Sequence, residues 1–186
     1  MVHATTILSV RRGAEVAMGG DGQVTLGETI IKHHARKVQR IEKIENKKVI
    51  YKVLVGFAGT AADAYNLFEK LEGKLDEYRG NLKTAAYELV KEWRSDKLLR
   101  KLDAMLAASD AQESYIISGM GDLIAPDDDI VALGSGGQIA LAVARALMKR
   151  TELSASEIVQ EALNITSDIC IYTNKEITVE VLQIAE

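Results

Sequence analysis

The apolar residues of this chain change their spacing in blocks, and the order of the blocks constrains the fold more than any single motif does. From Thr5 to Phe57 the sequence consists of β-branched and apolar runs separated by glycines, which is the pattern of β-strands. Two segments with the three-and-four spacing of helices follow, then strands, two more helices and a last strand. Blocks of each type, rather than strict alternation, favour an α+β protein with mostly antiparallel sheets. We therefore predict a four-layer αββα sandwich, in which a pair of helices covers each of two stacked sheets.

The boundaries of the expected elements follow from the same spacing and from turn and cap residues. Strands are expected at Thr5–Arg12, Glu15–Met18, Lys37–Ile41, Val49–Phe57, Ala104–Ser109, Ser114–Gly119, Ile130–Leu133 and Ile177–Ile184. Helices are expected from Thr60 to Tyr78, from Leu82 to Leu102 and from Ile139 to Lys149, and a fourth begins at the capping box of Ser154 and Glu157.

Length and composition limit the classes of protein to which the chain can belong. Its 186 residues suit one domain, which we place at residues 5–186. The single cysteine, Cys170, excludes an internal disulfide and a cysteine-cluster metal site. A net charge of −4 argues against a nucleic-acid partner, and no apolar run reaches the ~20 residues that span a bilayer. The first residues do not resemble a secretory signal, so we expect a cytoplasmic protein without a membrane partner.

A serine between glycines, in Leu133-Gly134-Ser135-Gly136-Gly137, joins an expected strand to an expected helix. A serine-hydrolase elbow needs glycine at the first of these positions and a histidine later in the chain. Leu133 occupies that position, and no histidine follows Ser135. The glycine patterns of nucleotide-binding loops are absent as well. Taken alone, these glycines indicate a tight turn between a strand and a helix.

The start of the chain offers a different nucleophile. If Met1–Ala4 form a propeptide that is removed, Thr5 carries a hydroxyl and a free α-amine on one residue. An α-amine has an ordinary pKa of ~7.7–8.0, so it can accept the hydroxyl proton near neutral pH without a histidine. A nearby cation lowers this pKa further, because it disfavours the ammonium form. The dipeptide Thr5-Thr6 by itself is better explained by β-propensity.

Six motifs spread over the chain carry a family resemblance. They are Thr5-Thr6-Ile7, Gly20-Asp21-Gly22-Gln23, Ala35-Arg36-Lys37-Val38, Gly56-Phe57-Ala58-Gly59, Gly134-Ser135-Gly136-Gly137 and Asp168-Ile169-Cys170-Ile171-Tyr172-Thr173-Asn174. Together they resemble the HslV (ClpQ) family, the peptidase subunits of a bacterial proteasome-like, ATP-dependent protease. The resemblance implies the fold of N-terminal-nucleophile hydrolases, which is the αββα sandwich, and the activity of a threonine endopeptidase.

The resemblance also implies roles for individual residues. Thr5 matches the nucleophile, whose own amine is the base. Lys37 matches the lysine whose charge keeps that amine neutral, and Asp21 matches the carboxylate that pairs with this lysine. Gly56 matches a residue whose backbone amide faces the oxyanion. Ser135 matches the serine that hydrogen-bonds the threonine amine.

Two further roles at the end of the chain come from the same resemblance. Asp168 is expected to support the corner of the site near Ser135. The backbone carbonyls of Ser167, Cys170 and Thr173 match the ligands of a structural sodium ion, and oxygen ligands of this kind suit a hard cation. The thiol of Cys170 takes no part in this set.

The partners implied by the resemblance are a hexameric AAA+ unfoldase of the HslU (ClpY) type and the unfolded proteins that it delivers. ATP and magnesium would bind to that partner only. The implied assembly is a homo-dodecamer of two stacked hexameric rings. The alternative is a catalytically inactive ring subunit or a binding module on the same fold. A third hypothesis, an amidase acting on small molecules, is disfavoured by the Lys37 and Gly-Ser-Gly-Gly motifs.

Two stretches depart from the family pattern. Gln138-Ile139 replaces the usual Pro-Tyr after the paired glycines, which is expected to alter the entry into the helix. Residues Glu42–Lys52 form a longer and more charged stretch than the usual loop before Gly56. We expect this insert to reshape either the substrate pocket or the contact with the ATPase.

If Thr5 is the catalyst, the active protein begins at Thr5. An acylated nitrogen is an amide, which has no basic lone pair, so a chain that retains Met1–Ala4 has a nucleophile without its base. Intact-mass measurement of protein with demonstrated peptidase turnover is expected to give the mass of residues 5–186. An active species that still carries Met1–Ala4 would contradict the mechanism.

Overall fold

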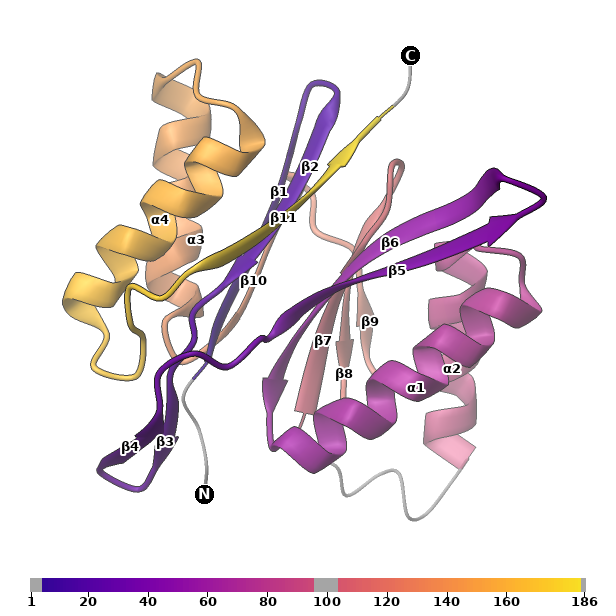
Figure 1. Cartoon of the computed structure of the whole chain (residues 1–186), viewed down its shortest axis with the longest axis horizontal. Helices are drawn as coiled ribbons and strands as arrows, with labels where there is room; N and C mark the ends of the chain where they lie inside the picture. Colours follow the sequence, from indigo (N-terminus) through magenta and orange to yellow (C-terminus); the bar gives the residue numbers. More distant parts are fainter. Residues whose placement is uncertain (1–4, 96–103, 185–186) are drawn as a thin grey trace.

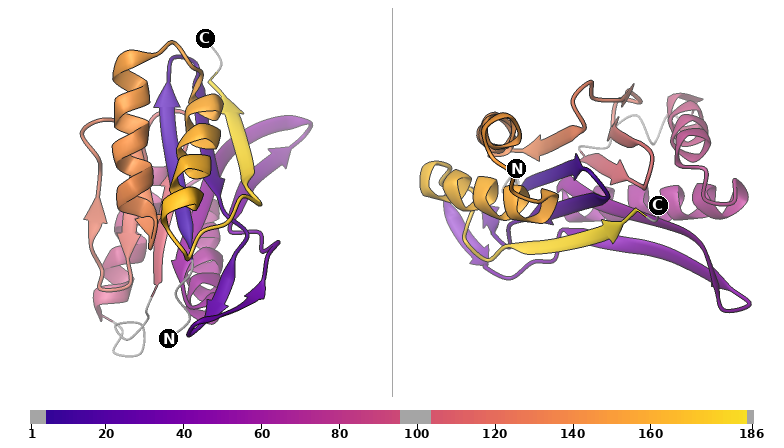
Figure 2. Two further views of the ribbon diagram at one scale, coloured as in Figure 1. Left: turned by 90° about the vertical axis from the view of Figure 1, so that its left-hand side faces the viewer. Right: turned by 90° about the horizontal axis from the view of Figure 1, so that it is seen from above.

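A computed structural model of the chain describes residues 5–95 and 104–184. Two sheets face each other, and each is covered on its outer side by two helices, α1 and α2 on one side and α3 and α4 on the other (Figures 1 and 2). This arrangement confirms the predicted four-layer αββα sandwich. The leader, residues 1–4, lies outside the described residues, as do residues 96–103.

The four-stranded sheet holds the start of the described chain at its centre. Its order is β10-β1-β2-β11, and all three pairings are antiparallel. The strands are β1 Thr6–Arg12, β2 Glu15–Gly20, β10 Ile130–Gly134 and β11 Thr178–Gln183. Because β1 lies between β10 and β2, Gly134 is opposite Thr6 on one side and Gly20 is opposite Ile7 on the other.

The five-stranded sheet is also antiparallel, in the order β5-β6-β7-β8-β9. Its strands are β5 Val38–Glu45, β6 Lys48–Gly59, β7 Ala104–Ser109, β8 Ser114–Ser118 and β9 Leu123–Ile124. A separate hairpin, β3 Val24–Leu26 and β4 Thr29–Lys32, was not predicted from the sequence. Its apolar side chains Leu26, Ile30 and Ile31 are exposed, so no alternation of buried and exposed residues marks it.

The helices are α1 Ala61–Glu77, α2 Leu82–Ser95, α3 Gly137–Arg150 and α4 Ala155–Ile169. The side chain of Thr60 accepts a hydrogen bond from the Asp63 amide, as expected of an N-cap. Ser154 and Glu157 form the predicted capping box at the start of α4. The described part of α2 ends at Ser95, and the predicted continuation to Leu102 falls outside the described residues. None of the helices within the described ranges is both long and apolar enough to cross a membrane.

Three apolar clusters hold the layers together. One lies between the five-stranded sheet and helices α1 and α2, and a second lies between the four-stranded sheet and helices α3 and α4. The third fills the space between the two sheets and includes Ile7, Met18 and Leu54. The apolar stripes that predicted the helices therefore face the sheets, as the sandwich requires.

The charged insert Glu42–Lys52 forms a β-hairpin arm, in which β5 continues to Glu45, beyond the predicted end at Ile41, and β6 begins at Lys48, next to the predicted start at Val49. Strands β5 and β6 pair from Val38 and Gly56 out to Glu45 and Lys48, and the turn residues Asn46 and Lys47 have φ values of 50° and 62°. The eight residues of β5 place the turn about 25 Å from the start of the strand, and Figure 1 shows the arm extending beyond the sheets. The expectation that the insert reshapes the substrate pocket is not supported for a pocket around Thr5 in the same subunit.

Replacing Trp93 by phenylalanine is expected to destabilise the fold. Trp93 is fully buried in α2, and its indole N–H donates to the Gly119 carbonyl at 2.6 Å. The variant loses this bond and leaves a small cavity, so we expect a cost of about 2–4 kcal/mol and a lower Tm in thermal unfolding. Tyr87→Phe on the same helix is the control, because Tyr87 is 58% exposed. Equal Tm values for the two variants would contradict this account.

Candidate active site

Thr5 lies directly before β1 and is almost completely buried, with 8% of its surface exposed. Its carbonyl oxygen accepts a hydrogen bond from the Ser135 amide at 2.8 Å. This contact continues the pairing of β1 with β10, in which Thr6 is opposite Gly134. The strand pairing therefore brings the Gly-Ser-Gly-Gly turn, far away in the sequence, against the residue predicted to be the nucleophile.

Asp21 follows β2 and is fully buried. Its Oδ1 atom accepts two hydrogen bonds, from the Thr6 amide at 2.8 Å and from Lys37 Nζ at 2.9 Å. Its Oδ2 atom accepts a third from the Gln23 amide at 2.9 Å. Three donors from three different residues thus converge on one buried carboxyl group. Through this one side chain, the backbone next to Thr5 and the amino group of Lys37 are held together.

Lys37 immediately precedes β5, and its side chain is 4% exposed. Besides the contact with Asp21, its Nζ atom donates to the Gln23 carbonyl at 2.5 Å. Burial lowers the pKa of Lys37 below its ordinary value, and the charge and hydrogen bond of Asp21 partly offset this effect. Two turn segments and the residue before β5 thus create a desolvated lysine–carboxylate pair beside the start of β1.

Ser135 and Asp168 occupy different positions relative to Thr5. Ser135 is exposed, and it reaches Thr5 through its backbone amide. Asp168 lies in the last turn of α4 with a 61% exposed side chain, and its carboxylate pairs with Lys175 at 2.6 Å. The structure thus brings Ser135 to Thr5, whereas it directs the Asp168 carboxylate to the loop between α4 and β11.

Gly56 lies inside β6, opposite Val38 on one side and Ala107 on the other. The neighbouring Phe57 amide donates to the Lys37 carbonyl on the β5 side. Because amides alternate in direction along a strand, the Gly56 amide points toward β7 and its partner Ala107. The expectation that this amide faces an oxyanion at Thr5 is not supported by this geometry.

The glycine at position 56 has a packing reason instead. A Cβ atom there would lie 2.6 Å from Cγ2 of Ile7 and 3.0 Å from Sδ of Met18. Both distances are shorter than van der Waals contact, so a larger residue would push the two sheets apart. Gly56 therefore permits the close approach of β6 to β1, the strand that directly follows Thr5.

The three carbonyls expected to bind sodium lie at and after the C-terminal end of α4. The Cys170 amide ends the helix by donating to Thr166, and the Cys170 carbonyl accepts from the Thr173 amide at 3.0 Å. Ser167 belongs to the last turn, where helix carbonyls lack helical partners. Carbonyl oxygens are hard ligands, and those at the C-terminal end of a helix carry partial negative charge, so this set suits a hard cation such as sodium. The Cys170 carbonyl keeps a second lone pair for this purpose.

Two polar partners at the site were not identified from the sequence. Gln23 supplies the carbonyl that accepts from Lys37, and its side-chain amide donates to the Ile171 carbonyl at 2.9 Å. The side-chain hydroxyl of Thr173 lies 2.5 Å from that of Thr6. The sequence did contain a signal for Gln23, because it lies two residues after Asp21 in the same motif. The pairing of Thr6 with Thr173, 167 residues apart, had no local signal.

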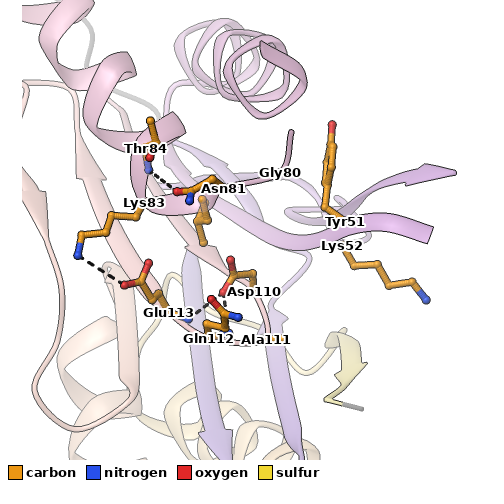
Figure 3. A pocket seen from close by; sticks show the side chains of 11 residues that line it. Tyr51, Lys52, Gly80, Asn81, Lys83, Thr84, Asp110, Ala111, Gln112 and Glu113 are labelled. Atoms are coloured by element: carbon orange, nitrogen blue, oxygen red, sulfur yellow. Dashed lines mark hydrogen bonds and ion pairs between the residues drawn. The ribbon is translucent and has the colours of Figure 1, made fainter. Parts of the chain in front are cut away.

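A groove of about 390 Å³ lies elsewhere, at the root of the β5–β6 arm (Figure 3). It is bounded by Tyr51 and Lys52 of the arm, by the turn between α1 and α2, and by the turn between β7 and β8. Its lining carries both charges, including Lys83 and Glu113 at 3.9 Å from each other. None of the predicted site residues lines this groove.

Comparison with known proteins gives concordant results. The family model described as "Proteasome subunit" matches residues 1–182. The ATP-dependent protease subunit HslV of Syntrophobacter fumaroxidans is 51% identical over 182 residues, which cover 98% of each chain. The crystal structure of eukaryotic HslV from Trypanosoma brucei is 46% identical, with a TM-score of 0.87, and the match covers 96% of this chain and 99% of the other.

A more distant match shows the fold alone. The structure of Thiobacillus denitrificans BPH in complex with epoxomicin has a TM-score of 0.69 at 13% identity, over 97% of this chain and 100% of the other. The resemblance inferred from the motifs is confirmed by the family model and by the two HslV matches, at 51% and 46% identity. The chain belongs to the proteasome family, and within it to the HslV group.

Proposed function

We propose that this chain is the threonine-type endopeptidase subunit of an ATP-dependent protease, with Thr5 as nucleophile. The observation that carries the proposal is the shared Oδ1 atom of Asp21, which binds both the Thr6 amide and Lys37 Nζ. It fixes a buried cation next to the residue whose hydroxyl and amine would react. An inactive ring subunit has no use for a desolvated lysine at this position, so the pair favours the active enzyme.

In the proposed reaction, the Thr5 hydroxyl attacks the scissile carbonyl while the Thr5 α-amine accepts its proton. The positive charge of Lys37 keeps the amine neutral by disfavouring a second cation, and it stabilises the developing negative charge on oxygen. The protonated amine then gives its proton to the leaving nitrogen, which breaks the peptide bond and leaves an ester on Thr5. Water, activated by the same amine, hydrolyses the ester and restores the hydroxyl.

Ser135 and Asp168 have supporting roles in this proposal. The Ser135 amide donates to the Thr5 carbonyl, and this contact between the two residues supports the proposal that the Ser135 hydroxyl binds the terminal amine. For Asp168 the proposed role is to hold the loop between α4 and β11 through Lys175. The Gly56 amide is left out of the proposal, because its direction in β6 assigns it to the sheet.

A sodium ion held by the carbonyls of Ser167, Cys170 and Thr173 would neutralise the C-terminal end of α4 and fix the following loop. We further propose the two stacked hexameric rings of the HslV type, an AAA+ unfoldase of the HslU type that binds ATP and magnesium, and unfolded polypeptides as substrates. The location of such an assembly is the cytoplasm. These proposals rest on the membership in the HslV group.

Thr5→Ala is expected to abolish hydrolysis of a small fluorogenic peptide, whereas Thr5→Ser, which keeps hydroxyl and amine, is expected to retain activity. Lys37→Ala should lower kcat/KM by several powers of ten, because nucleophile, base and cation act as a unit. Lys91→Ala is the control, since Lys91 is exposed and lies on α2. Assays use processed protein in the presence of the unfoldase, with assembly checked by its size in solution.

A Lys37→Ala variant that keeps more than about a tenth of the activity would remove Lys37 from the mechanism. Peptidase activity in the Thr5→Ala variant would show that Thr5 is not the nucleophile.

Asp21→Asn is expected to move the alkaline limb of the pH–rate profile to lower pH. The charge of Asp21 raises the pKa of Lys37 against the effect of burial. Without that charge the ammonium form of Lys37 is less stable, so Lys37 loses its proton at a lower pH. The neutral lysine then no longer keeps the Thr5 amine unprotonated or stabilises negative charge on oxygen. The measurement is kcat/KM against pH, with Asp122→Asn in a surface turn as control. An alkaline limb that stays in place would show that the charge of Lys37 does not determine it.

A further inference from the structure

The hydroxyls of Thr6 and Thr173 form a buried contact that the mechanism above does not use. They lie 2.5 Å apart, close enough for one to donate to the other. Thr6 is fully buried and Thr173 is 4% exposed. Thr6 belongs to β1 directly after Thr5, and Thr173 belongs to the loop between α4 and β11. Because successive side chains of a strand point to opposite faces, the Thr6 hydroxyl faces away from the side on which Thr5 reacts.

The space around this hydroxyl pair is closed by Gly136, the N-cap residue of α3. A Cβ atom at position 136 would lie 2.3 Å from Thr6 Oγ1, 2.6 Å from Thr166 Cγ2 and 3.0 Å from Thr173 Oγ1. No side chain fits there without displacing the pair. Because both threonines are almost completely buried, loss of one hydroxyl leaves the other without this partner and away from bulk water.

The loop that carries Thr173 is tied to the active-site turn at two further points. The Asn174 Oδ1 atom accepts from the Gly22 amide at 3.0 Å, and Gln23 Nε2 donates to the Ile171 carbonyl at 2.9 Å. Gly22 and Gln23 directly follow Asp21 in the chain. The loop thus holds the Asp21 turn from one side, while Thr173 holds the residue that follows Thr5.

Thr6 is the common member of the two networks. Its amide donates to Asp21 Oδ1, the atom that also binds Lys37, and its hydroxyl meets Thr173. The two bonds leave the same residue from its backbone and from its side chain, so together they restrict the rotation of β1 at its first residue.

We propose that Thr6 and Thr173 are positioning residues, whose hydroxyl contact sets the placement of Thr5 relative to Lys37 and links it to the loop after α4. The inference rests on the proposed role of Thr5 as nucleophile and base. A misplacement of about 1 Å can cost a reaction up to a hundred-fold. Loss of the contact is accordingly expected to lower kcat and to leave KM for a small peptide nearly unchanged.

The test compares Thr173→Val with Thr173→Ser in the full, processed assembly with the unfoldase present. Valine keeps the shape and removes the hydroxyl, whereas serine keeps the hydroxyl. Thr173→Val is expected to lower kcat between about ten- and a hundred-fold, and Thr173→Ser to restore most of it. Thr6→Val removes the same bond from the other side and should give a similar loss. The double variant should lose no more than either single variant, because both remove one contact.

A pH profile separates positioning from a general loss of folded enzyme. If Thr5 moves away from Lys37, the pKa of its amine rises, so the acid limb of the profile moves to higher pH. A smaller fraction of folded enzyme would lower the rate equally at all pH values without moving the limb. The matched control is Thr151→Val, which removes a threonine hydroxyl bonded to the Leu147 carbonyl at the distant end of α3. Assembly size and Tm are recorded for every variant.

The inference is overturned if Thr173→Val and Thr6→Val keep the wild-type kcat and acid limb, or if Thr173→Ser is as impaired as Thr173→Val. Additive losses in the double variant would also overturn it. Should Thr173→Val fail to assemble, Thr6→Val and Thr173→Ser still decide the outcome. The proposed function fails in a different way, namely by activity that persists in Thr5→Ala.

Discussion

The buried pair of Asp21 and Lys37 is the interaction on which the rest of the site depends. Removing two charges from water is costly, and their attraction repays the cost only where further hydrogen bonds complete the geometry. Here the Thr6 and Gln23 amides and the Gln23 carbonyl complete it. A pair of this kind contributes little to stability compared with a well-packed apolar pair. Its presence in the interior therefore points to a requirement for charge beside Thr5, which the fold is built to satisfy.

The packing between the two sheets determines the position of the Lys37 charge relative to Thr5. Lys37 enters β5 opposite Phe57, and β6 approaches β1 closely at Gly56, over Ile7. The cluster between the sheets, which includes Ile7 and Leu54, keeps this separation constant. The two halves of the site lie on different sheets, so their geometry is a property of the whole sandwich and not of either sheet alone.

Much of the architecture could be predicted from the sequence, because the blocks of strand and helix spacing are long and each has one buried face. The layers, the Thr60 cap and the Ser154 capping box were predicted correctly for this reason. The short β3–β4 hairpin was missed since its apolar residues are exposed. Strand β5 extends to Glu45, beyond the predicted end at Ile41, and this extension was missed because the residues from Glu42 to Glu45 are mostly charged and none is buried. Lys43 and Tyr51 both hydrogen-bond Asp76 and so fix the root of the arm.

The site was predictable only in part. The residues alone offered Thr5 only as one hypothesis, and the family motifs selected it. The partnership of Asp21 with Lys37 also came from the family motifs and is confirmed as a contact. Gly56 was assigned to the oxyanion because its motif matched, but a motif does not tell the direction of an amide, which depends on strand pairing. The contact between Thr6 and Thr173 depends on the tertiary fold and leaves no pattern in either segment.

In the proposed mechanism the base is the first amino group of the processed chain, which excludes a fusion at that end, so reporter groups have to be attached elsewhere. The β5–β6 arm offers such a place. Its turn at Asn46 and Lys47 is exposed and lies about 25 Å along the strand from Lys37. Both turn residues have positive φ values, a conformation that glycines in an inserted segment adopt readily. A fluorophore or affinity peptide inserted at this turn would leave the amino group at Thr5 free, and would allow processing, assembly and turnover to be followed on the same molecules.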